Sequence, residues 1–108
     1  IVEGRLDVIG TVTDSIRFLK GTSPEWMGLR ISGGDSSTFI YTRISDGHAD
    51  STGWANSGGG VYLSGAQTKI GIGNSKISGN KAYDGGGVFI NDGSATLYNS
   101  SISDNFAE

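Results

Sequence analysis

Three residues that could bind a cation lie close together in one polar stretch of the sequence. Asp46, His48 and Asp50 stand at alternate positions, and their side chains would suit Ca²⁺ if backbone carbonyl oxygens joined them as ligands. The stretch lacks the bidentate Glu and the spacing of an EF-hand loop, and a solvent-exposed turn explains the same residues. We therefore expect no cofactor, with Ca²⁺ at these three residues as the alternative.

A second set of residues has the chemistry to bind sugar rings or a peptide. Arg30, Tyr62 and Phe89 occupy equivalent positions in three similar segments, each between two apolar residues. On strands these side chains would point outward, one above another, and aromatic faces beside a guanidinium can stack on sugar rings. The alternative is a ladder that stabilises the sheet and is covered by a neighbouring segment.

Trp54 is a further candidate for ligand binding. It lies in segment 50–57, whose residues are extra to the repeat of the chain and should project as a loop. The alternative is that Trp54 folds back and caps a sheet edge. Trp26, which lies just before a predicted strand, is expected to pack against the core.

The residues do not form a recognisable catalytic set. Glycoside hydrolysis needs two carboxylates that flank the scissile bond, and a lyase needs a neutralised uronate and a strong base. Neither arrangement is evident. Arg43 and Lys76 share the position before Ile44 and Ile77, so they could stack outward and attract an anionic polymer weakly, although Ser101 ends the row. We expect no catalysis in this segment.

The elements that would position these side chains follow from internal repeats. The repeated segments are 74–82 with 99–107 and 44–49, and 28–32 with 60–64 and 87–91. Apolar residues alternate within each copy, which predicts short strands. Such strands cannot bury an apolar face alone, so equivalent positions should stack about 4.8 Å apart. Ile44, Ile77 and Ile102 then form one internal ladder, and Ile16 precedes Ile44 in an earlier coil.

Asn and Gly residues predict the corners between these strands. Asn tolerates a left-handed φ, bonds backbone groups and can stack from coil to coil. The Asn residues placed at bends are Asn74, Asn80, Asn99 and Asn105. The glycine triplets at 58–60 and 85–87 predict corners where the backbone passes too closely for a Cβ.

The composition agrees with a folded β protein and excludes several functions. Nineteen Gly residues and a single Pro suit short strands and sharp turns. A formal charge of −3 without a Lys/Arg cluster argues against nucleic-acid and anionic-membrane partners. No apolar run is long enough to span a membrane, and the absence of Cys excludes disulfides and thiolate metal sites.

Four kinds of motif recur or stand out in the chain: Gly-Gly-Gly-Val at 58–61 and 85–88, Ile-Ser-Gly-Asn at 77–80, Ile-Ser-Asp-Asn at 102–105, and the Trp-containing segment 26–31. Taken together, these motifs resemble those of bacterial right-handed β-helix repeat proteins, the polymorphic outer-membrane adhesins among them. The resemblance implies an all-β protein, a right-handed parallel β-helix or solenoid of about four coils. It also implies a secreted or cell-surface location. Because the chain begins at Ile1, we expect residues 1–108 to be one segment of a longer chain.

The fold alone does not select a function, because β-helices include polysaccharide lyases, glycosidases, adhesins and passive stalks. We expect a noncatalytic structural or adhesive module with a polysaccharide or a surface protein as partner. One alternative is a fragment of a carbohydrate-active enzyme, either a polysaccharide lyase or a glycosidase. Another is a protomer of an extracellular filament, because the two end coils would expose unpaired backbone groups to which neighbouring coils or identical protomers could stack.

Overall fold

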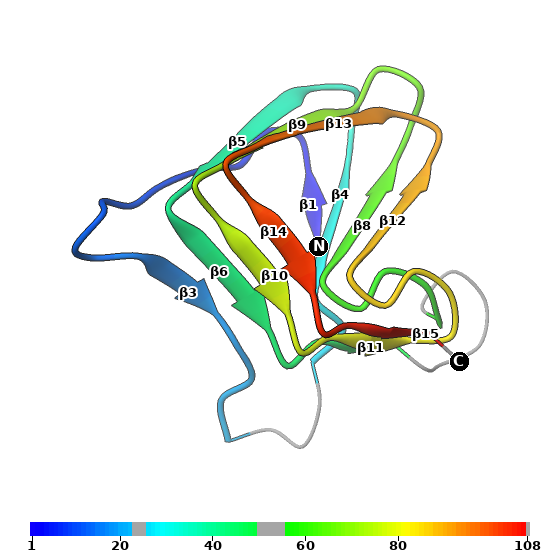
Figure 1. Cartoon of the computed structure of the whole chain (residues 1–108). Helices are drawn as coiled ribbons and strands as arrows, with labels where there is room; N and C mark the ends of the chain where they lie inside the picture. Colours follow the sequence, from blue (N-terminus) through cyan, green and yellow to red (C-terminus); the bar gives the residue numbers. More distant parts are fainter. Residues whose placement is uncertain (23–25, 50–55, 108) are drawn as a thin grey trace.

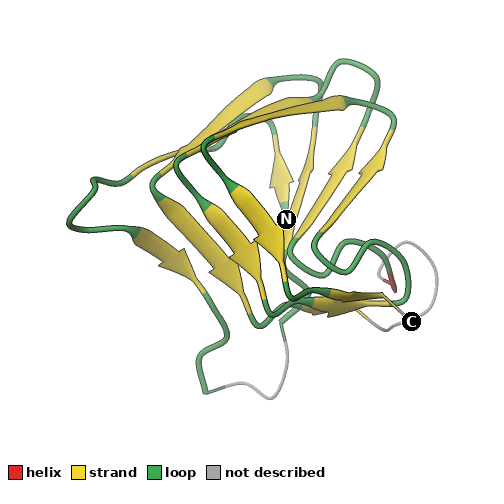
Figure 2. Cartoon of the chain, viewed as in Figure 1, coloured by secondary structure: helices red, strands yellow, loops and turns green. Residues whose placement is uncertain are grey.

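A computed structural model describes residues 1–22, 26–49 and 56–107, and their strands form four parallel sheets (Figures 1 and 2). The first sheet contains β1 (Val2–Glu3), β4 (Leu29–Ser32), β8 (Val61–Ser64) and β12 (Val88–Asn91). The second contains β2 (Asp7–Ile9), β5 (Ser36–Ile40), β9 (Lys69–Gly73) and β13 (Ser94–Tyr98). The third contains β3 (Ile16–Phe18), β6 (Thr42–Ser45), β10 (Lys76–Ser78) and β14 (Ser101–Ser103). The fourth contains β7 (His48–Ala49), β11 (Lys81–Ala82) and β15 (Phe106–Ala107).

The chain visits these sheets in the same order in every turn. Strands β4–β7, β8–β11 and β12–β15 make three complete turns, and β1–β3 precede them as a partial turn. Figure 1 shows the last turn, in orange and red, lying over the earlier ones. The all-β solenoid is therefore confirmed, with the first of the expected coils incomplete among the described residues. Within the described ranges there is no helix with the length and apolarity that crossing a bilayer requires.

The strand register confirms the repeats that the sequence predicts. Ile77 pairs with Ile44 on one side and with Ile102 on the other, which is the expected internal ladder. The preceding position in this ladder is Phe18 and not Ile16, because Phe18 pairs with Ile44. The Phe18 ring packs near the Phe39 ring at 6.4 Å between centroids, and fills the interior at the start of the stack.

Stacked apolar positions from successive turns fill the interior. The buried cluster comprises Val8, Ile31, Phe39, Ile44, Val61, Leu63, Ile70, Ile72 and Ile77. Every other residue of a strand faces this interior, so each turn contributes only a few apolar side chains and depends on its neighbours to cover them. Trp26 packs against the cluster as expected, and its Nε1 donates a hydrogen bond to the Ser45 carbonyl oxygen.

The two expected roles of asparagine fall on two different pairs. Asn74 and Asn99 adopt left-handed φ values of 48° and 46°. Asn80 and Asn105 instead form a ladder in which the Asn80 backbone N–H donates to Asn105 Oδ1 at 3.0 Å. Asn80 Oδ1 accepts the Gly47 N–H at 2.9 Å, and Asn80 Nδ2 donates to the Ile44 carbonyl oxygen and to Asn105 Oδ1. These amides join successive turns inside the stack.

The glycine triplets form close corners, as predicted. A Cβ at Gly60 would lie 2.6 Å from the carbonyl oxygen of Gly87, which is closer than real Cβ atoms approach. Gly58 and Gly85, the first residues of the two triplets, have φ values of 68° and 57°. Glycine is the residue that accepts both a positive φ and such a close backbone contact without strain.

The asparagine ladder yields a stability prediction. We expect Asn80→Ala to lower the free energy of unfolding by about 2 to 4 kcal/mol, because it leaves the buried Gly47 N–H and the Ile44 carbonyl oxygen without their side-chain partner. Asn105→Ala is the matched control and should cost about 1 kcal/mol, since water can replace an amide that is only partly buried. Urea unfolding followed by circular dichroism measures both values. Equal effects of the two variants would contradict the claim that the buried Asn80 amide stabilises the stack more than the partly buried Asn105 amide.

Candidate functional site

The structure brings Arg30, Tyr62 and Phe89 together, as the sequence predicts. They pair across β4, β8 and β12. The rings of Tyr62 and Phe89 stack with centroids 5.6 Å apart and planes 5° from parallel. The Arg30 guanidinium carbon lies 5.0 Å from the Tyr62 ring centroid, which is a cation–π geometry. The three side chains therefore form one continuous row.

This row offers a ligand little exposed surface. Arg30 is 4% exposed and Tyr62 is 9% exposed, while Phe89 is half-buried. Burial lowers the pKa of Arg30, and its interaction with Tyr62 acts in the opposite direction. Arg30 and Tyr62 also border a small cavity of about 270 Å³ beside Ile1 and Glu3. The burial and the stacking favour the sheet-stabilising alternative for Arg30 and Tyr62.

Of the other predicted site residues, the structure describes Asp46 and His48. Trp54 and Asp50 lie outside the described residues. Asp46 is exposed in the turn after β6 with φ 62°, and His48 begins β7, where its backbone N–H donates to the Trp26 carbonyl oxygen. Among the described residues, no group of three or more His, Asp or Glu side chains could hold a metal ion.

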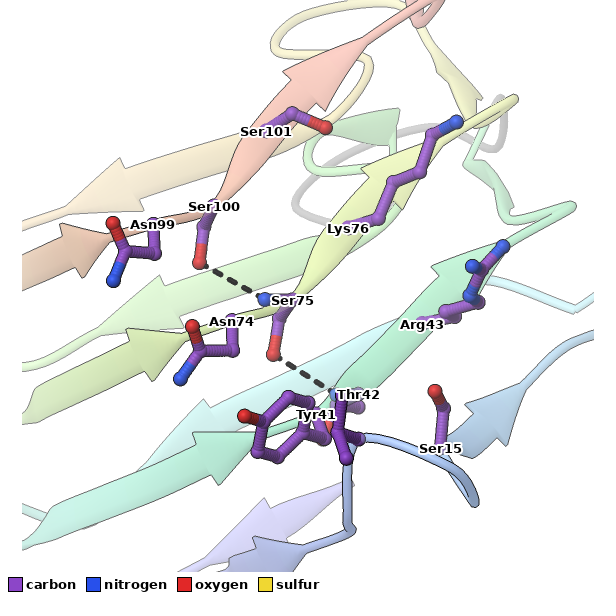
Figure 3. A pocket seen from close by; sticks show the side chains of 11 residues that line it. Ser15, Tyr41, Thr42, Arg43, Asn74, Ser75, Lys76, Asn99, Ser100 and Ser101 are labelled. Atoms are coloured by element: carbon purple, nitrogen blue, oxygen red, sulfur yellow. Dashed lines mark hydrogen bonds between the residues drawn. The ribbon is translucent and has the colours of Figure 1, made fainter.

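A groove of about 600 Å³ follows the corner between the second and third sheets. Three consecutive turns line it with equivalent triplets, and the loop before β3 contributes two further residues. The lining residues are Tyr41, Thr42 and Arg43, then Asn74, Ser75 and Lys76, then Asn99, Ser100 and Ser101, with Val12 and Ser15 from the loop. Figure 3 shows the triplets one above another. We call this feature the corner groove.

The first residue of each triplet turns the chain. Tyr41, Asn74 and Asn99 have φ values of 50°, 48° and 46°. This left-handed conformation is uncommon for residues other than glycine, and Asn adopts it more readily than most. Each triplet thus begins with the same sharp bend between a strand of the second sheet and a strand of the third.

The second residue of each triplet ties one turn to the next. The Thr42 N–H donates to Ser75 Oγ at 2.9 Å, and the Ser75 N–H donates to Ser100 Oγ at 3.1 Å (Figure 3). The Ser75 hydroxyl in turn donates to the Gly73 carbonyl oxygen at 2.7 Å. Thr42 and Ser75 are buried, so these hydrogen bonds hold the groove floor in place.

The third residue of the first two triplets carries the groove's charge. Arg43, Lys76 and Ser101 are exposed and pair across β6, β10 and β14. The predicted outward stacking of Arg43 and Lys76 is therefore confirmed. The sequence also showed that Ser101 ends the row, but it did not show that a left-handed corner beside the row creates a groove.

The lining of the corner groove suits binding better than acid–base catalysis. Among the described residues that line it there is no Asp, Glu or His. Glycoside hydrolysis requires paired carboxyl groups. Amide and cationic groups that recur from turn to turn can instead form hydrogen bonds along an extended polymer.

Comparison with known proteins gives a match to one family model. The model describes a right-handed beta helix region and matches residues 11–108. No curated protein and no solved structure gives a significant match to the chain.

The buried row predicts that Tyr62 stabilises the fold without holding a ligand. We expect Tyr62→Ala to lower the free energy of unfolding by about 3 kcal/mol, because it removes a large buried ring and leaves a cavity. Phe89→Ala should have a smaller effect because Phe89 is only half-buried. Urea unfolding tests both variants. Unchanged stability of Tyr62→Ala, together with lost retention on polysaccharide gels, would instead identify the row as a binding site.

Proposed function

The chain belongs to the right-handed β-helix family, and from this premise we propose that it is a noncatalytic module that binds a polysaccharide along the corner groove. The observation that carries the proposal is the threefold repetition of the lining triplet. We further propose that the module serves a secreted or cell-surface protein, as an adhesive surface or a scaffold. The enzyme-fragment alternative receives less support, because no carboxyl group of the described residues lines the groove.

The spacing of the triplets favours a polymer with a short repeat. Neighbouring strands of a sheet lie about 4.8 Å apart, a distance comparable to the length of one sugar unit in an extended chain. Each turn therefore presents one amide or phenol and one outward side chain to roughly one sugar. The hydroxyl-bearing residues between them are hydrogen-bonded within the fold and form the groove floor. A single small molecule would not use the repetition.

An aromatic surface next to the groove also favours sugars. Tyr98, which precedes the groove residue Asn99, lies across Gly73 so closely that a Cβ there would collide with the ring. The Tyr98 side chain is 49% exposed. An exposed aromatic ring supported by backbone is a suitable surface for stacking against the apolar face of a sugar.

A bulky residue in the groove should abolish binding without disturbing the core. We expect Ser101→Tyr to lose retention on polysaccharide gels, because Ser101 is exposed and its replacement would fill the groove. Ser36→Tyr is the matched control, since Ser36 is also an exposed first residue of a strand but lies in the second sheet. Affinity electrophoresis over a panel of acidic and neutral polysaccharides measures retention. If wild type is retained by none of them, or if Ser101→Tyr is retained as well as wild type, the proposal is wrong.

The last turn supports a second candidate function, lengthwise assembly. Ile90, Leu97 and Ile102 are 38% to 45% exposed, whereas the residues they pair with in the preceding turn are at most 1% exposed. Strands β12–β15 also lie at the edges of their sheets. Only another β-helix turn would cover these apolar positions and pair all four strands at once. We propose that a second copy of the chain can stack here.

Charges on this face should prevent stacking. We expect wild type to associate as its concentration rises and the double variant Leu97→Asp/Ile102→Asp to remain monomeric, because burying a carboxylate is unfavourable. Leu19→Asp is the control, since Leu19 is similarly exposed but follows β3. Sedimentation velocity over a range of concentrations distinguishes these states. A monodisperse wild-type monomer throughout would contradict lengthwise assembly.

A further inference from the structure

Three cationic side chains lie in one row on the outer face of the third sheet. Arg17 of β3 pairs with Arg43 of β6, which pairs with Lys76 of β10. All three residues are exposed. Ser101 of β14 continues the row without a charge. We call Arg17, Arg43 and Lys76 the cationic row.

The cationic row is electrostatically unfavourable in the free protein. Like charges directly opposite each other on neighbouring strands destabilise a sheet, and strand spacing is well within the Debye length of about 8 Å at physiological salt. Among the described residues, the one ion pair joins Arg5 to Asp7, so it does not neutralise the row. An anionic ligand would relieve this repulsion.

The cationic row borders the corner groove. Arg43 and Lys76 line the groove directly (Figure 3), and Arg17 extends the same line towards the first turn. A ligand in the groove would therefore run across the strands, along the axis of the stack. It would meet a positive charge at each of three successive turns and would have neutral hydrogen-bonding groups at its other side.

We propose that the polymer bound in the corner groove is an acidic polysaccharide whose carboxylate or sulfate groups are recognised by the cationic row. This inference rests on the proposed polysaccharide-binding function and names the ligand class. Arginine forms paired hydrogen bonds with planar or tetrahedral oxyanions, and lysine adds a compact charge. A polysaccharide suits the site better than a nucleic acid, because three cations on a chain of net charge −3 make a small electrostatic footprint.

Serine variants of the cationic row test the proposal, since Ser101 shows that the row accepts serine. Binding is measured to polygalacturonate, dextran sulfate, neutral dextran and single-stranded DNA. We expect wild type to bind one or both acidic polysaccharides more tightly than dextran. Each single variant, Arg17→Ser, Arg43→Ser or Lys76→Ser, should weaken that binding about 2- to 5-fold, as for exposed ion pairs. The triple variant should weaken it about 10- to 100-fold and should reduce its dependence on salt.

Lys69→Ser is the matched control. Lys69 is an exposed strand residue of the second sheet, and its two cross-strand neighbours, Ser36 and Ser94, are both serine. The variant changes the net charge by the same amount as each single variant of the row. We expect it to bind acidic polysaccharides as wild type does and to unfold at the same urea concentration.

The outcomes separate the two proposals. Preference for polygalacturonate identifies carboxylate groups as the ligand's anions, preference for dextran sulfate identifies sulfate groups, and either preference supports the inference if the triple variant loses it. Equal binding to dextran with an unaffected triple variant overturns the inference but leaves polysaccharide binding intact. Tighter binding to DNA than to both acidic polysaccharides also overturns it. Failure to bind any polysaccharide, neutral or acidic, overturns the proposed function itself.

Discussion

Pairing of each strand with its equivalent in the next turn is the constraint on which the whole structure depends. Strands of two to five residues present too little apolar surface to remain folded alone, so every inward residue must be covered by the same position one turn away. Ile77 between Ile44 and Ile102 is the clearest case. The burial of Ile77 and the exposure of Ile102 show that coverage comes from the following turn.

Polar ladders determine where the turns bend. The Asn80 amide and the Ser75 hydroxyl each accept a backbone N–H of one turn and donate to other groups of the stack. Buried polar groups are stable only when hydrogen-bonded. The hydrogen bonds of each ladder therefore hold the corner beside it in one defined position. The floor of the corner groove is one of these ladders. A structural requirement of the fold thus also produces a rigid, repeating surface.

The same requirement separates residues that the fold needs from residues that are free to vary. Inward positions and corner positions are constrained by packing and by backbone geometry, and they hold mainly apolar residues, Asn, Asp, Ser, Thr and Gly. Outward positions have no such restriction, which is why Arg43, Lys76 and Ser101 can succeed one another in a single row. Arg30 and Tyr62 also face away from the interior, but their burial makes them part of the structure. Outward direction alone therefore does not identify a binding surface.

The sequence by itself determined most of the strands, the stacking of equivalent residues and several of the corner residues. Period-two alternation shows which side of a strand is apolar, and the repeat shows which residues stack, so Ile77 and Asn80 could be placed without coordinates. Register in the first turn could not be read, because Phe18 and Ile16 both fit the alternation and only packing selects Phe18. The tertiary structure alone decided that Arg30 is buried and that the triplets border a groove. Both outcomes depend on which segments, far apart in the sequence, lie side by side in the folded chain. The periodicity of a single segment contains no information about its neighbours in space.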